Sequence, residues 1–554
     1  MMIKKILRCF CVSVALGCCW QAEAADFASL IPRPAGMEQI SGTLSLPSGF
    51  KVSVGSLPQG MADEAVKFVN ALNLATGLDA AVTRDSNEKC LIDVVIDPSL
   101  PTEGYGLKIK SDGIDVKASG ASGLFYAFQT LKKLLPPNVM AGRRGDDGAA
   151  YELPLGQIDD RPRFEYRGFM LDVSRHFFDA QQIMKMLDLM AAYKLNRFHW
   201  HLTDDQGWRL PVEGYPELTA SGATNRNILR SDFSAQTQWR DGDSVAYGPY
   251  AYTVDEIRAV VAYAADRHIE VIPEIDMPGH MVAAIHSYPE FSTDPASEKL
   301  SLHEDFSHNI WNKGGVSRDV LDVSNPDVMR FVRTVVDVLA DLFPSRYIHI
   351  GGDECPTLAW ENSDACAAKM KELGLTDVRA LQSWFTKEVA DYARERHGRM
   401  VMGWNELITE GNADMEMIKA IDPVIFCWLG GEDKAEANGL RYVYTPFNGG
   451  YYINRSYADI DQIGAGRDGA LALTINVNPP AHANCIGVQG TFWTEQVDRY
   501  QDLEYLALPR LLGIAEQGWS AETDKDYDDF RARVAKDTEY LDLAEFNYGS
   551  HQLK

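Results

Sequence analysis

Short apolar stretches alternate with longer segments of helical periodicity from residue 163 onward. The apolar stretches predict eight strands, at residues 166–172, 197–202, 270–275, 347–350, 400–404, 424–428, 441–444 and 485–489. Apolar residues at helical spacing predict helices between most of them, at residues 179–194, 253–267, 325–342 and 378–397, and a final helix at 503–517. Residues 448–484 show no clean helical period. Eight consecutive β-α units are typical of a (β/α)8 TIM barrel with insertions, an α/β fold.

A different pattern precedes this region, over residues 26–160. Alternating or apolar runs predict strands at residues 50–54, 91–96, 106–110 and 113–117. Helical spacing predicts helices at residues 61–76 and 121–135, the second stopped by Pro136 and Pro137. Residues 141–150 are expected to form a surface loop. The 554 residues therefore divide into a smaller α+β accessory domain at 26–160, a catalytic barrel at 161–520, and a C-terminal helical tail at 521–554 packed on the barrel.

The N-terminus has the pattern of a signal peptide at residues 1–24. Lys4, Lys5 and Arg8 precede an apolar stretch at 9–20 that is too short to span a bilayer, and small residues follow at Ala22 and Ala24. The pattern predicts a secreted or periplasmic protein. An alternative is a lipoprotein signal ending at Cys18, which would place the protein on the cell surface. No later stretch is long and apolar enough for a membrane span.

Charge and cysteine content exclude several classes of function. The formal net charge of −26 argues against nucleic acid and anionic lipid as partners, because both attract basic surfaces. Five cysteines follow the signal segment: Cys90, Cys355, Cys366, Cys427 and Cys485. They have no regular spacing, so they predict neither a disulfide framework nor a zinc ribbon, and their odd number leaves at least one free thiol.

Polar and aromatic residues gather where the predicted strands end. Strand exits carry the following side chains: Arg175, Asp204, Asp205, Asp276, His280, Asp353, Glu354, Trp404, Glu406, Trp428, Trp493 and Glu495. Active sites of TIM barrels lie at this end of the strands. The accumulation favours a carbohydrate-type active site.

Five motifs within residues 161–519 together resemble glycoside hydrolase family 20, the β-N-acetylhexosaminidases. They are Arg167-Gly-Phe-Met-Leu-Asp-Val-Ser-Arg-His176, His199-Trp-His-Leu-Thr-Asp-Asp205, Asp276-Met-Pro-Gly-His280, His349-Ile-Gly-Gly-Asp-Glu354 and Trp493-Thr-Glu495. Each motif alone is modest evidence, but all five in order are specific, and the accessory domain resembles that of the family. The resemblance implies a bacterial, secreted, exo-acting retaining enzyme. Its substrate would be a glycan with a terminal β-linked N-acetylglucosamine or N-acetylgalactosamine.

The adjacent pair Asp353-Glu354 is the centre of the implied chemistry. Ordinary retaining glycosidases hold two carboxyl groups about 5–5.5 Å apart across the scissile bond, which neighbouring residues rarely achieve. In the substrate-assisted alternative, the 2-acetamido oxygen of the substrate attacks the anomeric carbon and an oxazolinium intermediate forms. By the resemblance, Glu354 is the acid/base, and Asp353 bonds the acetamide N–H. Like charge at this distance is expected to raise one pKa, which suits the acid.

The resemblance also implies roles for other side chains. Tyr452 would hydrogen-bond the acetamide carbonyl, with Tyr451 as the alternative register. Arg167 would bind the 3- and 4-hydroxyls, the alternative being a salt bridge at the barrel floor. Asp204 and His280 would form a supporting pair near Glu354. Trp404, Trp428 and Trp493 would form aromatic walls around the sugar. Glu495 would bind the 4- or 6-hydroxyl.

One position departs from the family pattern. The family usually places Asp two residues after the acetamide-binding Tyr, whereas this chain has Asn454, followed by Arg455. One interpretation is a neutral hydroxyl contact. The other is acceptance of a 6-sulfated N-acetylglucosamine, because the loss of a carboxylate removes repulsion of sulfate.

Two rival functions are considered. His199 and His201 point to one face of a strand, as barrel metal ligands can, but no further residue beyond Asp204 completes a set, so no metal or other cofactor is expected. A non-catalytic glycan-binding protein would be expected to lack Asp353 or Glu354, and both are present. Linkage, sugar preference and oligomeric state stay open.

Overall fold

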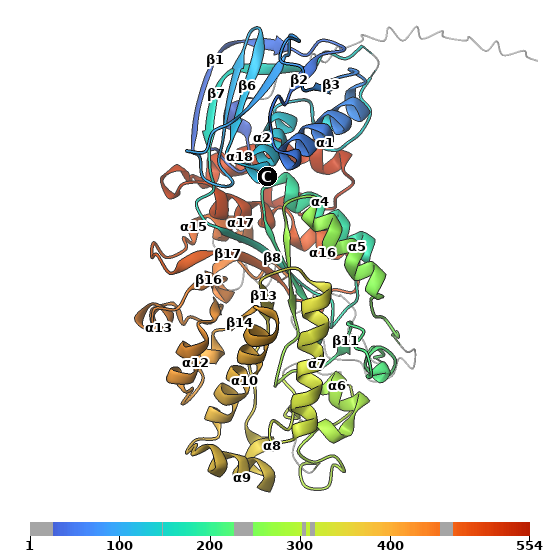
Figure 1. Ribbon diagram of the computed structural model, residues 1–554, viewed down its shortest axis with the longest axis vertical. Helices are drawn as coiled ribbons and strands as arrows, with labels where there is room; N and C mark the ends of the chain where they lie inside the picture. Colours follow the sequence, from blue (N-terminus) through green and yellow to red (C-terminus); the bar gives the residue numbers. More distant parts are fainter. Residues whose placement is uncertain are drawn as a thin grey trace, which may run out of the picture.

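The chain folds into a sheet-and-helix unit stacked on one end of a barrel (Figure 1). The computed structural model describes residues 26–146, 148–225, 247–301, 306–310, 316–454 and 469–553. The predicted signal peptide at 1–24 and Arg455 lie outside the described residues.

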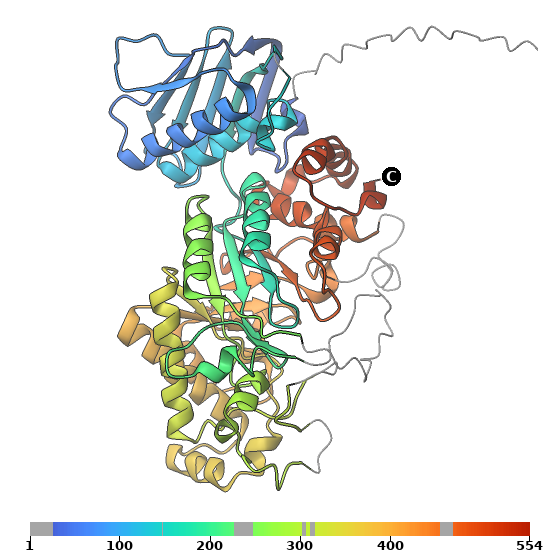
Figure 2. The ribbon, with the colours of Figure 1, turned by 90° about the vertical axis from the view of Figure 1, so that its right-hand side faces the viewer.

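The N-terminal unit is a seven-stranded mixed sheet with the order β1-β7-β5-β6-β4-β2-β3. Its strands are β1 Gly36–Ser45, β2 Lys51–Ser53, β3 Ala81–Thr83, β4 Ile92–Ile96, β5 Tyr105–Lys110, β6 Gly113–Ala118 and β7 Glu152–Asp160. Helices α1 (Gln59–Thr76) and α2 (Ala121–Lys133) cover the face of the sheet that looks toward the barrel, as Figure 2 shows. The short α3 (Pro137–Met140) follows.

Four of these strands and both long helices match the sequence prediction, whereas β1, β3 and β7 were not predicted. Strand β1 is mostly exposed, so it lacks the apolar alternation that marks a strand. Strand β7 contains Pro154 and Gly156, two residues that argue against a strand.

The second unit is a closed eight-stranded parallel barrel, as predicted, in the order β12-β13-β14-β15-β16-β17-β8-β9. Its strands are β8 Tyr166–Asp172, β9 Arg197–His201, β12 Glu270–Glu274, β13 Tyr347–His349, β14 Met400–Trp404, β15 Val424–Cys427, β16 Tyr442–Tyr444 and β17 Cys485–Phe492. A two-stranded ribbon, β10 Thr203–Asp204 and β11 Gly207–Trp208, follows β9. Apolar side chains fill the barrel interior, among them Tyr166, Met170, Ile272, Met402, Phe426 and Val443.

Helices surround the barrel at the predicted places. The four long ones are α4 Ala180–Ala192, α5 Val254–Ala265, α7 Pro326–Leu342 and α10 Arg379–His397. Shorter helices lie in the connections: α6 Val282–Ser287, α8 Leu358–Glu361, α9 Asp364–Leu373, α11 Glu406–Thr409, α12 Met415–Ile421, α13 Glu432–Ala437 and α15 Gly469–Asn476. Asp179 and Thr253 form capping boxes that begin α4 and α5.

The single final helix predicted at 503–517 is wrong. The segment forms two helices, α16 Tyr500–Ala507 and α17 Arg510–Trp519. Pro509 stands between them, and it cannot continue a helix because it has no backbone N–H and its ring clashes with the preceding turn. Helix α15 lies in the stretch without a clean helical period. It is apolar on nearly all sides and packs against α17.

The C-terminal helix α18 (Tyr527–Leu543) contacts both units rather than the barrel alone. Arg533 Nη2 pairs with Glu516 Oε1 of α17 at 2.8 Å. Lys133 Nζ of α2 pairs with Asp537 Oδ2 of α18, also at 2.8 Å. The tail therefore joins the N-terminal unit to the barrel. Within the described ranges, no helix combines the length and hydrophobicity that a membrane crossing requires.

Candidate active site

The acidic pair Asp353-Glu354 lies in a tight turn directly after β13. Gly351 and Gly352 lead into it with φ of 65° and 88°, and Glu354 itself has φ of 46°. A Cβ on Gly351 would overlap the Asp276 carboxylate, so the turn requires glycine there. The left-handed backbone at Glu354 is rare for a residue with a side chain and is found mostly at functional sites. Asp353 is buried, whereas the Glu354 side chain is 44% exposed and can reach a ligand.

His280 stands between the acidic pair and two further carboxylates. Its Nε2 lies 3.6 Å from Glu354 Oε2 and 3.7 Å from Asp353 Oδ2. Its Nδ1 lies 3.2 Å from Asp204 Oδ1 and 3.3 Å from Asp205 Oδ2. The structure thus brings Asp204 and His280 together beside Glu354, as expected from the sequence.

The charges around His280 set the protonation of the site. Burial alone would lower the pKa of His280, but the Asp204 carboxylate, with Asp205 and Glu354 close by, holds that pKa well above its ordinary value. The nearby His280, whose Nε2 lies 3.6 Å from Glu354 Oε2, in turn lowers the pKa of Glu354 against the effect of burial. In the free protein, Glu354 is therefore an anion held by a protonated His280.

The raised pKa in the acidic pair belongs to Asp353, not to the expected acid Glu354. Burial raises the pKa of Asp353, and the nearby Glu354 and Glu274 add to the rise. Asp276 lies beside it, and burial and the Asp353 charge raise its pKa well above the ordinary value. The prediction that repulsion raises the pKa of the acid is wrong here, because His280 stabilises the charged form of Glu354 more than the neighbouring carboxylates destabilise it.

Four aromatic side chains lie at the carboxyl ends of the barrel strands, the same end that carries the acidic pair. Trp404 and Trp493 have ring centroids 5.7 Å apart, and Trp428 stacks on Tyr452 at 5.8 Å with an interplanar angle of 20°. Burial raises the pKa of Tyr452 well above its ordinary value against a hydrogen bond with Trp493, and the Asp353 charge adds to the rise. Its hydroxyl is therefore a neutral donor beside Asp353 and Trp493.

The choice between the two tyrosines is settled by their surroundings. Tyr451 is fully buried and its hydroxyl donates to the carbonyl oxygen of Val477, away from the acidic pair. Tyr452, not Tyr451, faces the site.

Arg167 does not lie in the site, which corrects the prediction that it binds the sugar. It is the second residue of β8, so it lies at the barrel floor, fully buried. Its Nη1 and Nη2 donate to Glu103 of the N-terminal unit at 2.8 and 2.9 Å, and its Nε donates to the carbonyl oxygen of Lys194. The alternative, a salt bridge at the floor, is the observed arrangement.

Arg175 provides the cation at the opposite, catalytic end of the barrel. It follows the end of β8 and pairs with Asp204 Oδ2 at 2.8 Å and with Asp172 Oδ2 at 3.2 Å. Its guanidinium lies 5.0 Å from the centroid of the Trp493 ring and 3.9 Å from Glu495 Oε1. Its position in the sequence indicates this placement, because Arg175 follows the end of the predicted strand at 166–172, whereas Arg167 is near the start of that strand.

Glu274, a buried carboxylate at the end of β12, has no role assigned from the sequence. It contacts three histidines and accepts a hydrogen bond of 2.8 Å from Trp404 Nε1. The histidine contacts are His199 at 2.9 Å, His201 at 2.6 Å and His349 at 2.9 Å. The statement that nothing beyond Asp204 completes a set around His199 and His201 is thus wrong. Of these three contacts, only that of His201 is a hydrogen bond, and neither ring nitrogen of His199 has a hydrogen-bond partner among the described residues. The expectation of no metal stays a prediction.

Glu406 is a second residue that the sequence analysis left unassigned. Both of its carboxylate oxygens lie 3.0 Å from Trp428 Nε1, which donates to them. Burial and the nearby Asp353 raise the pKa of Glu406 to about 8. Glu406 thereby fixes the wall formed by Trp428.

Asn454 lies two residues after Tyr452, which forms a β-bridge with Thr491 near the end of β17. It is half-buried, and its Oδ1 has no hydrogen-bond partner among the described residues. No contact between Asn454 and the acidic pair is found in the described part of the chain.

Comparison with known proteins identifies the two units. A model described as "Glycosyl hydrolase family 20, catalytic domain" matches residues 164–522, and one described as "Glycosyl hydrolase family 20, domain 2" matches residues 28–161. A beta-hexosaminidase of Porphyromonas gingivalis is 36% identical over 82% of this chain and 56% of its own length. The chain thus spans little more than half of that relative. A beta-hexosaminidase of Vibrio furnissii is 32% identical over 90% of this chain and 77% of its own length.

Solved structures give the same result. The exo beta-N-acetylglucosaminidase of Vibrio harveyi, in complex with N-acetylglucosamine, superposes with a TM-score of 0.77 at 30% identity, over 94% of this chain and 78% of that chain. A Streptomyces plicatus beta-hexosaminidase mutant, in complex with its product GlcNAc, gives a TM-score of 0.75 at 28% identity over 95% of this chain and 97% of that chain. With the closed barrel, the acidic turn and the aromatic pocket in place, the chain belongs to glycosyl hydrolase family 20 and is a β-N-acetylhexosaminidase.

Proposed function

We propose that this β-N-acetylhexosaminidase removes a terminal β-linked N-acetylhexosamine, with Glu354 as acid/base and the substrate's own acetamide as nucleophile. The observation that carries the proposal is the convergence of Glu354 and Asp353 on one atom, Nε2 of His280, at 3.6 and 3.7 Å. A retaining enzyme with two protein carboxylates sets them on opposite sides of one glycosidic bond, a placement that two adjacent residues facing the same imidazole nitrogen are poorly suited to provide. The nucleophile is then supplied by the substrate.

Asp353 and Tyr452 are proposed to hold the acetamide group. The Asp353 carboxylate accepts the acetamide N–H and offsets the positive charge that develops on the oxazolinium ring. Tyr452 donates to the acetamide carbonyl oxygen. Trp404, Trp428 and Trp493 enclose the acetamide methyl and the sugar ring, which excludes water from the developing ring.

The proton that Glu354 delivers is shared with His280. In the free protein, the pair carries one proton, and it lies on His280. A glycosidic oxygen next to Glu354 and the loss of water from the site both favour the neutral carboxylic acid, so binding moves this proton toward Glu354. Glu354 then protonates the leaving oxygen, and its carboxylate activates the water that opens the oxazolinium ring.

Arg175 and Glu495 are proposed to bind the sugar hydroxyls farthest from the scissile bond. Their side chains approach within 3.9 Å of each other at the rim, beside Trp493. N-acetylglucosamine is proposed as an accepted terminal sugar, because the structurally similar proteins of Vibrio harveyi and Streptomyces plicatus hold it.

The test is the variant Glu354→Gln, with Asp353→Asn as its matched partner. Glu354→Gln should lower kcat by about 100- to 10,000-fold on a substrate with a poor leaving group, and much less on an activated aryl glycoside, which needs no acid. Asp353→Asn should lower kcat on both substrates alike. Unchanged turnover by Glu354→Gln would remove Glu354 from the mechanism.

Acceptance of a 6-sulfated sugar remains a separate proposal, motivated by Asn454 in place of Asp. Hydrolysis rates of plain and 6-sulfated aryl N-acetylglucosaminides test it, and no turnover of the sulfated substrate would refute it.

Secretion also stays a proposal. N-terminal sequencing of the mature protein should begin after Ala24, or at Cys18 if the protein is a lipoprotein.

A further inference from the structure

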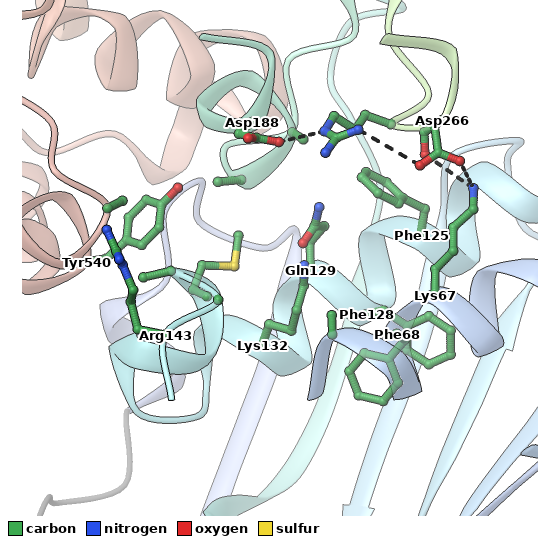
Figure 3. A pocket seen from close by; sticks show the side chains of 18 of the residues that line it. Lys67, Phe68, Phe125, Phe128, Gln129, Lys132, Arg143, Asp188, Asp266 and Tyr540 are labelled. Atoms are coloured by element: carbon green, nitrogen blue, oxygen red, sulfur yellow. Dashed lines mark hydrogen bonds and ion pairs between the residues drawn. The ribbon is translucent and has the colours of Figure 1, made fainter. Parts of the chain in front are cut away.

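A cavity of about 530 Å³ lies between the N-terminal unit and the barrel (Figure 3). It is bordered by α1 and α2, by α4, by Asp266 and Arg267 just after the end of α5, and by α18. The C-terminal ends of α4 and α5 lead into the first residues of β9 and β12, so the cavity lies at the barrel floor. The acidic pair lies at the opposite end of the strands. The volume of the cavity is within the range of about 300–1,000 Å³ that small-ligand sites occupy.

The floor of this cavity is aromatic. Phe68 and Phe128 stack with ring centroids 4.3 Å apart at an angle of 6°. Phe125 and Met140 extend the apolar surface. Asp188 and Asp266 lie across the cavity from this floor. The cavity therefore combines apolar and polar side chains, a mixture that suits a sugar ring.

All but one of the basic side chains that line the cavity are already paired. The pairs are Lys67 with Glu64 and Asp266, Arg267 with Asp188, Lys185 with Glu504, and Arg143 with Glu545. Lys132, on α2, makes no ion pair or side-chain hydrogen bond within the described ranges. Burial and the nearby Arg267 lower the pKa of Lys132 to about 8, so it still carries most of its charge at pH 7. The cavity thus holds one uncompensated cation.

Gln129, one turn before Lys132, adds an unsatisfied amide. Its side chain is 5% exposed, and its Oε1 is buried without a hydrogen-bond partner in the part of the chain that the structure describes. Figure 3 shows the Gln129 amide directed into the middle of the cavity, above Lys132. A buried amide oxygen without a partner is unfavourable, and a ligand hydroxyl that donates to it would remove that cost.

We propose that this cavity is a second, non-catalytic carbohydrate site that binds a monoanionic sugar. The ligand's acidic group pairs with Lys132, its hydroxyls bond the Gln129 amide, and its apolar face packs on Phe125. A single negative charge matches the single uncompensated cation. A uronic acid and a sulfated hexose share this chemistry. An acidic glycan held here would tether the enzyme to substrates that carry acidic residues.

Binding of glucuronic acid, followed by calorimetry or saturation-transfer NMR, tests the proposal. The intact protein should bind glucuronic acid at least tenfold more tightly than glucose, which has the same ring without the charge. The variant Lys132→Met, which keeps the apolar stem, should lose at least tenfold in affinity, and Gln129→Leu should weaken binding as well. The control Lys108→Met, which removes an exposed lysine of β5 in the same N-terminal unit, should bind normally.

Several outcomes would overturn the proposal. Equal binding of glucuronic acid and glucose, or undiminished binding by Lys132→Met, would refute the charge pairing. Binding of benzoate as tight as that of glucuronic acid would refute a sugar as the ligand. A sugar 6-sulfate and glucuronic acid should displace each other from the cavity. This outcome would support the site and would show that it recognises the acidic group rather than one parent sugar.

The wild-type protein offers a second measurement that does not depend on the folding of a variant. A lysine of lowered pKa forms a Schiff base with pyridoxal phosphate, which borohydride reduction fixes for mass spectrometry. Lys132 should be labelled, and glucuronic acid should protect it; labelling without protection would contradict the proposal. Turnover of an aryl N-acetylglucosaminide should be unchanged in Lys132→Met, so the outcome is independent of the proposed catalytic roles.

Discussion

The side chains that matter most in this site are defined by where they stand on a strand. Arg167 and Arg175 belong to the same motif, yet Arg167 begins β8 and Arg175 follows its end. The (β/α)8 topology then sends one to the domain junction and the other to the pocket. The motif alone does not show which of the two arginines binds the sugar, because both lie within the same ten residues. Only their positions relative to the end of β8 distinguish them.

Replacement of Arg175 by Met should damage catalysis more than folding. The change removes a cation from Asp204 and from the rim near Glu495, and a lost charge-assisted contact costs about 1.5–3 kcal/mol. We expect kcat/KM to fall by about 10- to 100-fold, with most of the effect in KM. Steady-state kinetics on an aryl N-acetylglucosaminide measure it. A kcat/KM equal to that of the wild type would show that Arg175 does not contact the sugar.

The alkaline limit of activity should depend on Asp204. Activity requires one proton on the His280–Glu354 pair. Because Asp204 holds the pKa of His280 above its ordinary value, that proton persists to higher pH. In Asp204→Asn, the pKa of His280 falls, so the proton and the activity are lost at lower pH.

The alkaline limb of kcat/KM against pH should move down by about one unit or more in this variant. The acidic limb reports a group that must be ionised, which we assign to Asp353, and it should move less. An alkaline limb at the wild-type pH would separate His280 from the proton that Glu354 delivers.

At the scale of elements, the sequence predicted the strands and helices whose apolar residues recur at a regular spacing. The eight barrel strands are short apolar runs buried on both faces, and each was found. The exposed strand β1 has no such run, and the break at Pro509 was overlooked within an apolar stretch. The candidate site followed from the strand exits. The proton location did not, because it depends on distances from His280 to four carboxylates that only the folded chain brings together.

The turn after β13 should tolerate no side chain at Gly351. Gly351→Ala adds a Cβ that overlaps the Asp276 carboxylate, at a φ of 65° that also disfavours alanine. Displacement of Asp353 and Glu354 by even an ångström should lower kcat/KM by about 100-fold. The matched control is Gly374→Ala at the end of α9, with φ of 71° and no atom within 4 Å of the new Cβ.

The control separates backbone strain from damage to the site. Gly374→Ala should cost about 1–2 kcal/mol of stability and leave kcat/KM unchanged. If Gly351→Ala loses no more activity than Gly374→Ala, the acidic turn is not held by the contact with Asp276.

At the scale of the whole molecule, the accessory unit braces the barrel floor. Arg167 joins Glu103, and Lys194 Nζ pairs with Asp160 Oδ2 at 2.8 Å, both across the junction. The Lys194–Asp160 pair is fully buried, and in the other pair only Glu103 is partly exposed. Trp519 of α17 packs within the core of the N-terminal unit. The two units are therefore expected to unfold together, although the catalytic residues all lie in one of them.

Replacement of Arg167 by Met should destabilise the protein without a specific loss of catalysis. The variant leaves Glu103 without its bidentate partner, and breaking a buried pair costs about 3–5 kcal/mol. The midpoint of thermal unfolding should fall clearly, while KM at a temperature where the variant is folded stays near the wild-type value. A normal melting temperature with a large rise in KM would restore Arg167 as a sugar ligand.

The central claim is that the nucleophile belongs to the substrate, and a pair of substrates tests it directly. An aryl β-N-acetylglucosaminide and the aryl β-glucoside with the same leaving group differ only in the 2-acetamido group. Because an intramolecular nucleophile contributes a large rate advantage, kcat/KM for the glucoside should be at least about 1,000-fold lower. A glucoside cleaved within tenfold of the N-acetylglucosaminide would contradict substrate assistance and the roles assigned to Asp353 and Tyr452.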